Sequence, residues 1–350
     1  MAVVKDSCPR TSTVLRYPLS SYVDCIRWIS SLSPLEKSFL VSSIDTNTHS
    51  PSLDIYSIPN DCQTPKPQIT NSWVPPSRVT SLACTPSLFV ASTLSGTLHF
   101  FVTPSASELS PITTVGEANH SPHIEKICSV GLRDGGGECC VTVGDKGGIN
   151  LIAIGEGKGI PVSKRVLDGS GRVSYTAVRW ASGNEFATGG VGVGLQWWDM
   201  RNPGTPVSQL KEIWDKEKAS GIIHSVDVNP SRKHTCLAGG SSGTVLAWDL
   251  RWPKQPVFLS SEKNESRSLS NSEIWEVQFA RTCSSNASSS HVLPAMFCSE
   301  DGVLGVLEQG KEAVELLEEP CAINSFDIHW NNSSDVICSL EWESIALLSR

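Results

Sequence analysis

The sequence predicts an all-β protein built from about seven repeated units, and three observations lead to this expectation. One phrase is written twice, as GGVGVGLQWWDMRNPGTP at 189–206 and GGSSGTVLAWDLRWPKQP at 239–256. Glycines that are expected in hairpin turns recur at positions 96, 147, 194 and 243, and successive positions are 47 to 51 residues apart. Short segments rich in valine, isoleucine and threonine alternate with turn residues along the chain, a pattern typical of strands.

The second copy of the phrase shows the layout of one unit. A strand is predicted at 235–239, the turn of a two-residue hairpin at Ser242-Gly243, and the next strand at 244–249. The residues at 245–248 are all apolar and alternate between the two faces of this strand. Both faces are therefore expected to be buried, as in a sheet stacked between two neighbours.

The same layout is repeated elsewhere, with a short strand before each hairpin. Further hairpins are predicted over 39–58, 88–101, 139–152, 295–307 and 336–348. The preceding strands are predicted over 23–29, 78–84, 124–130, 175–181, 222–228, 274–280 and 323–329. In the last hairpin Glu343 stands where a turn glycine is expected. The sixth unit is lengthened by ESRSLSNS and CSSNASSS, two segments that are expected to be loops.

Seven units of about four short strands, with a period of about 40–50 residues, indicate a seven-bladed β-propeller. The segment 13–19 is expected to supply the outer strand of the last blade, which closes the ring and removes an exposed sheet edge. A helical solenoid is excluded because the chain has no apolar stretch of about 12 residues with helical periodicity. Residues 1–350 then form a single domain, with approximate blades at 20–60, 76–103, 122–155, 173–212, 221–260, 272–310 and 321–350 plus 13–19.

Charge and composition argue against several classes of function. The chain has 28 Lys and Arg against 36 Asp and Glu, a net charge of −8, and no basic run. Neither direct nucleic-acid binding nor binding to an anionic membrane is therefore expected. The first ten residues lack the apolar segment of a signal peptide, and no apolar run reaches the ~18 residues of a membrane span. The 12 cysteines are expected to be reduced and mostly buried.

No set of residues in the sequence predicts catalysis, a cofactor or a metal. His120 and His123 lie near Cys128, but a zinc site needs four convergent ligands and the chain has no C-x-x-C pair. The glycine-rich stretches 155–159 and 189–194 do not match a phosphate-binding loop and are interpreted as blade turns. A G-x-S-x-G nucleophile motif is also absent. The protein is therefore predicted not to be an enzyme, with no catalytic, cofactor-binding or metal-binding residues.

Two blades carry the dipeptide that gives the WD-repeat family its name. Trp198-Asp199 and Trp248-Asp249 end the third strand of their blades, and the turn Ser299-Glu300-Asp301-Gly302 resembles the usual turn of the family. The chain thus resembles WD-repeat proteins over nearly its whole length, most clearly from 140 to 307, and this implies the propeller fold. Because only two of seven blades keep Trp-Asp, and no blade has the Gly-His pair of the family, the blades are expected to rely on apolar packing.

The motif Trp-Asp-x-Arg occurs twice and ends at Arg201 and Arg251. It resembles the motif by which some WD-repeat proteins dock onto the adaptor of cullin-based ubiquitin ligases, which implies a ligase substrate receptor as an alternative function. The acidic residue that the docking motif carries in its hairpin turn is replaced here by Gly192 and Ser242. The other interpretation is architectural, with each arginine paired to a local carboxylate or carbonyl.

Six segments point to a narrower resemblance. They are VTVGDKGGINL, IIHSVDVNP, GGSSGTVLAWDLR, EIWEVQF, FCSEDG and CAINSFDI, between 141 and 328. In order and spacing they are similar to the WD-repeat nucleoporins named for a mass of forty-three kilodaltons, of which the chain resembles a plant-like or divergent member. The resemblance implies a scaffold in the Y-shaped outer-ring complex of the nuclear pore, at the nuclear envelope of the nucleus. It also implies docking to an α-solenoid nucleoporin, a role in mRNA and protein transport, and no membrane insertion.

Residues that open the first strand of each unit are expected to line one mouth of the central channel, where a partner could bind. This group contains Arg78, Tyr175, His224, Trp275 and Asn324. Trp275 is favoured because aromatic residues are enriched at interface hot spots, and its alternative role is packing between blades. Trp252 is a further candidate, because it follows the end of a strand and precedes a proline.

Ser-Pro and Thr-Pro pairs begin at positions 33, 50, 64, 103, 110 and 121, all in predicted loops. Phosphate added there would repel acidic neighbours or pair with an arginine. Cell-cycle phosphorylation in the loops 59–77 and 104–123 is therefore a hypothesis. The alternative is that each proline only forms a turn after a small polar residue.

Overall fold

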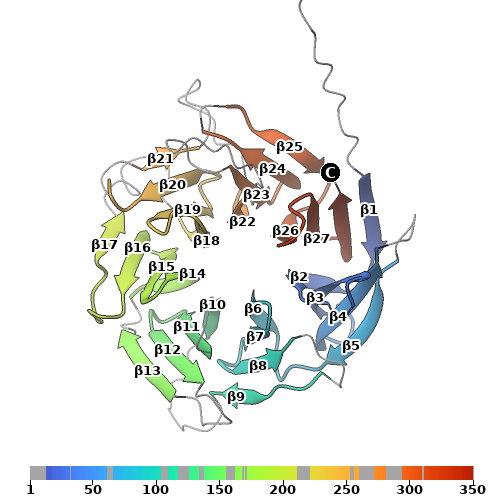
Figure 1. Cartoon of the computed structure of the whole chain (residues 1–350), viewed down its shortest axis with the longest axis horizontal. Helices are drawn as coiled ribbons and strands as arrows, with labels where there is room; N and C mark the ends of the chain where they lie inside the picture. Colours follow the sequence, from blue (N-terminus) through green and yellow to red (C-terminus); the bar gives the residue numbers. More distant parts are fainter. Residues whose placement is uncertain are drawn as a thin grey trace, which may run out of the picture.

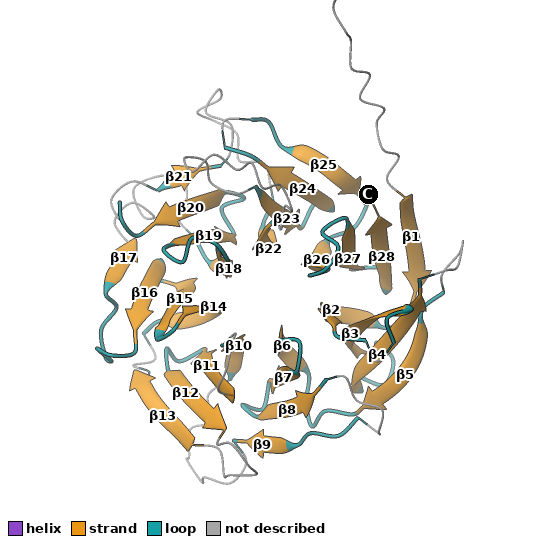
Figure 2. Ribbon diagram, viewed as in Figure 1, coloured by secondary structure: helices purple, strands orange, loops and turns teal. Residues whose placement is uncertain are grey.

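Seven four-stranded antiparallel sheets surround a central channel in a computed structural model of the chain (Figure 1). This confirms the all-β, seven-bladed propeller, and every regular element in the described part of the chain is a strand (Figure 2). The structure describes residues 13–31, 33–60, 66–103, 109–116, 126–133, 138–154, 162–167, 169, 172–210, 221–252, 256–259, 272–280, 294–309 and 311–349. Within these ranges no helix is long and apolar enough to cross a membrane.

Each blade is a meander whose strands follow one another outward from the channel. Blades 1 to 6 are β2–β5, β6–β9, β10–β13, β14–β17, β18–β21 and β22–β25, and blade 7 is β26–β28 with β1. The innermost strands are β2 (Tyr22–Ile29), β6 (Val79–Cys84), β10 (Ile127–Leu132), β14 (Ser174–Ser182), β18 (Ile223–Val228), β22 (Ile274–Phe279) and β26 (Ile323–Ile328). The second strands are β3 (Glu36–Ile44), β7 (Leu88–Thr93), β11 (Glu138–Gly144), β15 (Glu185–Val191), β19 (Thr235–Gly240), β23 (Ala295–Ser299) and β27 (Asp335–Leu340).

The two outer positions of each blade complete the sheets. The third strands are β4 (Pro51–Pro59), β8 (Leu98–Val102), β12 (Ile149–Ile154), β16 (Leu195–Asp199), β20 (Val245–Asp249), β24 (Val303–Leu307) and β28 (Ser344–Ser349). The outer strands are β5 (Gln68–Trp73), β9 (Thr113–Val115), β13 (Val162–Leu167), β17 (Ser208–Leu210), β21 (Val257–Phe258), β25 (Val314–Glu318) and β1 (Thr13–Pro18). The serine- and asparagine-rich segments expected as loops in blade 6 lie outside the described residues, apart from Ser272.

The N-terminal strand closes the last blade, as predicted. β1 pairs antiparallel with β28, from Thr13 opposite Ser349 to Pro18 opposite Ser344. The N–H of Leu19 then donates to the carbonyl of Glu343 over 2.8 Å. The start and the end of the propeller therefore share one sheet (Figure 1). Because β28 is paired on both sides, the junction leaves it with no exposed edge.

Apolar side chains fill the spaces between neighbouring blades. The predicted strand at 244–249 is β20, and its residues from Val245 to Trp248 are all buried. Leu246 and Trp248 pack into a cluster shared with blade 4. Val245 and Ala247 pack into a cluster shared with blade 6. Alternate side chains thus contact opposite neighbours, and burial of both faces is confirmed.

The hairpins between second and third strands turn on residues with positive φ. The predicted turn glycines at 96, 147, 194, 243 and 302 have φ values of 81°, 83°, 65°, 67° and 84°. In blade 2 the N–H of Gly96 donates to Thr93, and the N–H of Thr93 donates to the carbonyl of Thr97, each over 3.0 Å. The loop therefore has three residues, with one left-handed glycine. The predicted two-residue loop is wrong, because both of its common forms need positive φ at the first central position, which Ser95 and Ser242 do not have.

The glycine pairs of the repeated phrase make room for the following blade. A Cβ atom on Gly189 would lie 2.4 Å from Cγ2 of Ile223, and one on Gly239 would lie 2.8 Å from Cγ2 of Ile274. Ile223 and Ile274 begin the innermost strands of blades 5 and 6. A side chain at either glycine would push two blades apart. The glycine pairs of the repeated phrase therefore have a structural role.

Glu343 holds the left-handed position of the last turn, with φ of 53°. An L-residue pays about 1–2 kcal/mol for this conformation, whereas glycine adopts it freely at an entropic cost of about 0.5–1 kcal/mol. We predict that Glu343→Gly raises the free energy of unfolding in urea by about 0.5 kcal/mol. Glu343→Ala is the control, because it also removes the 2.9 Å contact with Thr46 but keeps the strain. A glycine variant no more stable than the alanine variant would contradict the prediction.

Candidate functional site at the mouth of the channel

A β-bulge interrupts all seven innermost strands near their start. The pairing with the second strand skips one residue in each blade, namely Asp24, Thr80, Cys128, Thr176, His224, Trp275 and Asn324. A bulge leaves its extra residue unpaired and redirects the side chain. These bulge residues gather at one end of the channel, which we call the mouth.

The residue after the bulge joins its blade to the next one. The innermost strand of a blade is an edge strand, so its outward N–H groups need acceptors. The hydroxyl oxygens of Ser81, Ser129, Ser225 and Ser325 accept from the N–H groups of Val130, Val178, Val277 and Ile26, over 3.1 to 3.4 Å. Glu276 does the same for Phe326 over 3.1 Å. Blade 4 has Ala177 at this position, which offers no acceptor.

Arg27 connects three blades inside the channel. Its Nη2 donates to Oε1 of Glu276 over 2.6 Å, and its Nη1 donates to Oγ of Ser325 over 2.9 Å. The hydroxyl of Ser325 also donates to Oε2 of Glu276 over 2.8 Å. The two charged side chains are 20% and 12% exposed. A pair so poorly hydrated is tolerated because further hydrogen bonds satisfy both groups.

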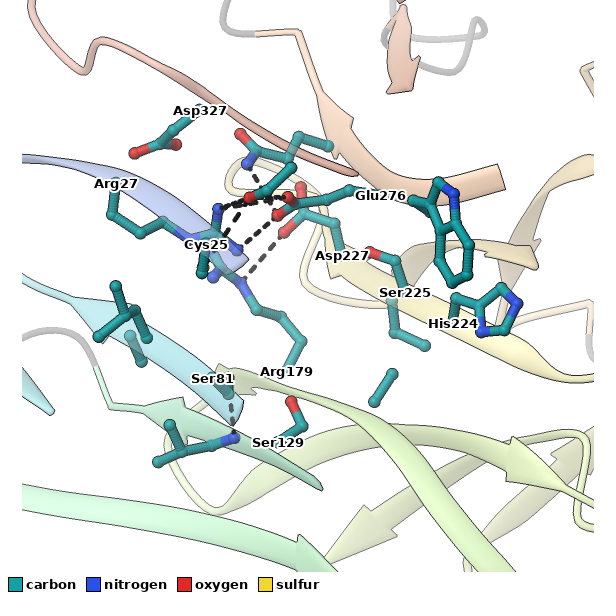
Figure 3. A pocket seen from close by; sticks show the side chains of 18 of the residues that line it. Cys25, Arg27, Ser81, Ser129, Arg179, His224, Ser225, Asp227, Glu276 and Asp327 are labelled. Atoms are coloured by element: carbon teal, nitrogen blue, oxygen red, sulfur yellow. Dashed lines mark hydrogen bonds and ion pairs between the residues drawn. The ribbon is translucent and has the colours of Figure 1, made fainter. Parts of the chain in front are cut away.

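The channel contains a cavity of about 220 Å³ behind the mouth (Figure 3). Its wall includes the carboxylates of Asp24, Asp227, Glu276 and Asp327 and the guanidinium groups of Arg27 and Arg179. Arg179 pairs with Asp227 over 3.1 Å, and Oδ2 of Asp327 accepts from the N–H of Trp28 over 2.8 Å. The cavity wall thus carries more negative than positive groups, and most of them bind across blade boundaries.

Aromatic and acidic side chains pair at the mouth beside blades 5 and 6. Nε2 of His224 lies 2.6 Å from Oε2 of Glu273, and the His224 and Trp275 ring centroids are 4.8 Å apart. Nε1 of Trp275 donates to Oε2 of Glu300 over 2.5 Å. Each ring is therefore held by a carboxylate from a neighbouring segment.

The mouth continues across blades 7 and 1. Nδ2 of Asn324 donates to the hydroxyl of Tyr22 over 3.0 Å, and the Arg78 guanidinium lies 5.5 Å from the Tyr22 ring centroid. Nε of Arg78 donates to Oδ1 of Asp24 over 2.9 Å. Burial raises the pKa of the Tyr22 hydroxyl, and the Asp24 carboxylate adds to this effect. The side chains of Asn324, Tyr22, Arg78 and Asp24 are thus linked by direct contacts.

Four of the six predicted partner-binding candidates meet at this mouth. His224, Trp275 and Asn324 are bulge residues. The Arg78 guanidinium lies over the ring of Tyr22, which is hydrogen-bonded to Asn324. Tyr175 lies one position before the bulge of blade 4, and its side chain is buried with its hydroxyl donating to Gln196 over 2.8 Å.

Trp252, the sixth candidate, is 68% exposed but lies on the face of the propeller opposite the mouth. Trp252 comes shortly after Asp249, which pairs with Thr235 at the start of β19. The start of β19 lies beside the end of β18, whereas the bulge is at the start of β18. Sequence reasoning missed Asp24 and its neighbour Tyr22. Asp24 could have been found by aligning the seven units, because it occupies the same position as His224.

Both Trp-Asp-x-Arg motifs form the same tight local structure. Nε and Nη2 of Arg201 donate to the Asp199 carboxylate over 2.9 and 2.7 Å, and its N–H donates to the same group over 2.9 Å. Arg251 is paired with Asp249 in the same way. Hydrogen bonds from the arginine hold the pKa of each aspartate below its usual range. This pairing is the architectural interpretation of the motif, although the guanidinium groups stay exposed.

The other motif residues also have structural contacts. Nε1 of Trp198 donates to the hydroxyl of Thr188 over 2.9 Å, and Trp248 is fully buried. In blade 6 the hydroxyl of Ser299 donates to Oδ1 of Asp301 over 2.5 Å, just before the left-handed Gly302. These residues shape strands and turns.

Burial lowers the reactivity of two cysteines in the cores between blades. It raises the pKa of the Cys338 thiol to about 12 and that of Cys236 further still. These thiols stay protonated at neutral pH and react slowly. Among the residues that the structure describes, no three His, Cys, Asp or Glu side chains are placed to hold a metal ion.

Some of the sequence hypotheses fall on parts that the structure does not describe. The two histidines at 120 and 123, the glycine-rich stretch 155–159 and the proline-directed positions 64 and 121 lie outside the described residues. Of the remaining proline-directed positions, Thr103 is buried and its hydroxyl donates to the carbonyl of Pro86 over 3.3 Å.

We predict that Arg27→Met lowers the free energy of unfolding by about 3 kcal/mol, because Glu276 is left with an uncompensated charge. Adding Glu276→Met to that variant should recover at least half of the loss, because neither member of the pair is then left as an uncompensated charge. Urea unfolding of both single variants and the double variant measures the coupling. Strictly additive losses would show that the two side chains do not act as a pair.

Comparison with known proteins assigns the chain to a family. No protein-family model matches it. It is 48% identical to the nuclear pore complex protein NUP43 of Arabidopsis thaliana, over 96% of this chain and 97% of that protein. It is 25% identical to mouse and 26% identical to human nucleoporin Nup43, over 62% and 59% of this chain and 47% and 45% of those proteins. These relatives confirm the predicted location at the nuclear pore, and the chain belongs to the Nup43 family of nucleoporins.

Proposed function

We propose that the protein is a non-catalytic scaffold subunit of the Y-shaped outer-ring complex of the nuclear pore. In this role it binds other nucleoporins and supports the transport of mRNA and protein. The observation that carries the proposal is the 48% identity to a nuclear pore protein, which extends over 96% of the chain and thus over all seven blades. The partner implied by the sequence resemblance is an α-solenoid subunit.

The physical character of the channel supports a scaffold role. An active site needs an activated nucleophile or an acid–base pair that faces a substrate cavity. Here Arg27 binds Glu276 and Arg179 binds Asp227, so the best-placed charges join blades together. A closed propeller with such internal joints is a rigid disc, which holds a docking surface in a fixed orientation.

A substrate receptor of a cullin-based ubiquitin ligase is the alternative function. It would use Arg201 and Arg251 as docking residues. The pairing of each arginine with its own aspartate favours the scaffold, because an arginine already bound by a carboxylate must give up that partner to dock.

We predict that the tagged chain, recovered from an extract enriched in nuclear envelopes, brings outer-ring nucleoporins with it in near-stoichiometric amounts, as measured by mass spectrometry. The double variant Arg201→Ala, Arg251→Ala should recover the same nucleoporins, because both arginines lie in turns and contact only local carboxylates.

Two controls make this result decisive. Thermal unfolding establishes that the double variant is folded. Recovery of a ligase adaptor and a cullin by the wild-type chain, lost in the double variant and without nucleoporins, would replace the scaffold by the receptor function.

A further inference from the structure

The mouth is strongly acidic between blades 6 and 1. Glu273 and Glu300 belong to blade 6, Glu341 lies at the β27–β28 turn of blade 7, and Asp24 is the bulge residue of blade 1. The N–H of Glu300 donates to the carbonyl of Glu273, and the N–H of Glu341 donates to Ala322 at the start of β26, each over 2.9 Å. Both turns therefore lie at the mouth end of their blades. Arg78 is the basic side chain that faces this group.

Asp24 has one oxygen that the protein does not satisfy. Its side chain is only 8% exposed, and both donor groups of Arg78 bind the same atom, Oδ1. Oδ2 is buried and has no hydrogen-bond partner among the described residues, although Asp24 lines the cavity. Burial raises the pKa of Asp24 even though Arg78 opposes the shift. A buried acceptor without a donor costs folding free energy, which a ligand N–H can restore.

Aromatic side chains border this oxygen-rich surface. Trp275 is fixed by its hydrogen bond to Glu300, Tyr22 is fixed by Asn324, and Trp342 is 64% exposed beside Glu341. Aromatic faces attract lysine and arginine groups, and the attraction increases when the site excludes water. Tryptophan and arginine are also the residues most enriched at interface hot spots. The mouth therefore combines negative charge, aromatic walls and an unused acceptor.

We propose that the mouth between blades 6 and 1 is the surface on which the propeller docks its partner, and that a lysine or arginine from a basic segment of that partner occupies the cavity. A small rotation of the Asp24 side chain brings Oδ2 to the cavity, where the ammonium or guanidinium group donates to it, and the aromatic rings of Trp275 and Tyr22 flank the stem of the basic side chain. The cavity of about 220 Å³ is large enough for one basic head group. The proposal rests on the scaffold function and adds the face and the chemistry of the contact.

The charge pattern selects this occupant over others. A nucleic acid, an anionic membrane or an acidic peptide would be repelled by the carboxylates of the mouth and cavity, which Arg78, Arg27 and Arg179 only partly neutralise. A basic protein segment is attracted, and the attraction should weaken with salt because the outer carboxylates are exposed.

The test uses the full tagged chain in nuclear-envelope extract and compares Asp24→Asn and Trp342→Ala with the wild type. Asp24→Asn keeps the size of the side chain and an acceptor for Arg78 but removes the charge. Trp342→Ala truncates a side chain on the mouth that is exposed and not needed for the core. Trp252→Ala is the matched control, because Trp252 is 68% exposed on the opposite face of the propeller, against 64% for Trp342. Thermal unfolding of each chain establishes that it is folded.

We expect each mouth variant to recover at least tenfold less outer-ring nucleoporin than the wild type, and Trp252→Ala to recover the wild-type amount. Recovery by the wild type should also fall when salt is raised from 0.1 to 0.5 M. If folded mouth variants recover as much as the wild type, or Trp252→Ala alone loses the partner, the mouth is not the docking surface and the scaffold function still stands. If the wild type itself recovers no nucleoporin, the scaffold function fails.

Discussion

The pairing of β1 with β28 is the constraint on which the rest of the structure depends. Each blade buries both of its faces against neighbours, so a set of blades is stable only when the ring is closed. Closure here uses a strand from the start of the chain in a sheet from its end. Leu15 and Tyr17 of β1 also pack against the core shared by blades 7 and 1. The strand thus contributes apolar packing as well as backbone hydrogen bonds.

Closure explains why the channel is polar and yet does not resemble an active site. Seven edge strands converge around one axis, and each presents N–H groups that need acceptors. Side chains such as Ser129 and Glu276 supply these acceptors from the preceding blade, and Arg27 adds a charged link. The polar interior is therefore part of the joint between blades. The surface that we propose for recognition is the mouth, where the bulges turn His224 and Trp275 away from the sheet.

Local patterns in the sequence were sufficient for the fold. Turn glycines such as Gly96, the apolar run of β20 and the segment that became β1 are signals within a few residues, and each was located correctly. The site depends on contacts that no local pattern contains. Arg27 and Glu276 are 249 residues apart, and only the curvature of the ring brings them together. Tyr175 was wrongly grouped with the mouth residues, because it occupies the buried position before the bulge residue Thr176, which only an alignment of the seven units would have shown.

A truncation tests most directly whether the closed ring is the basis of both stability and docking. Two shortened chains would be compared with the full chain by thermal unfolding and by recovery of nucleoporins from nuclear-envelope extract. One lacks residues 1–12, which precede β1, and the other lacks residues 1–18 and so has no β1. The account predicts that the first behaves like the full chain, while the second unfolds at a markedly lower temperature and loses its partners. A chain without β1 that keeps both the unfolding temperature and the partners would contradict it.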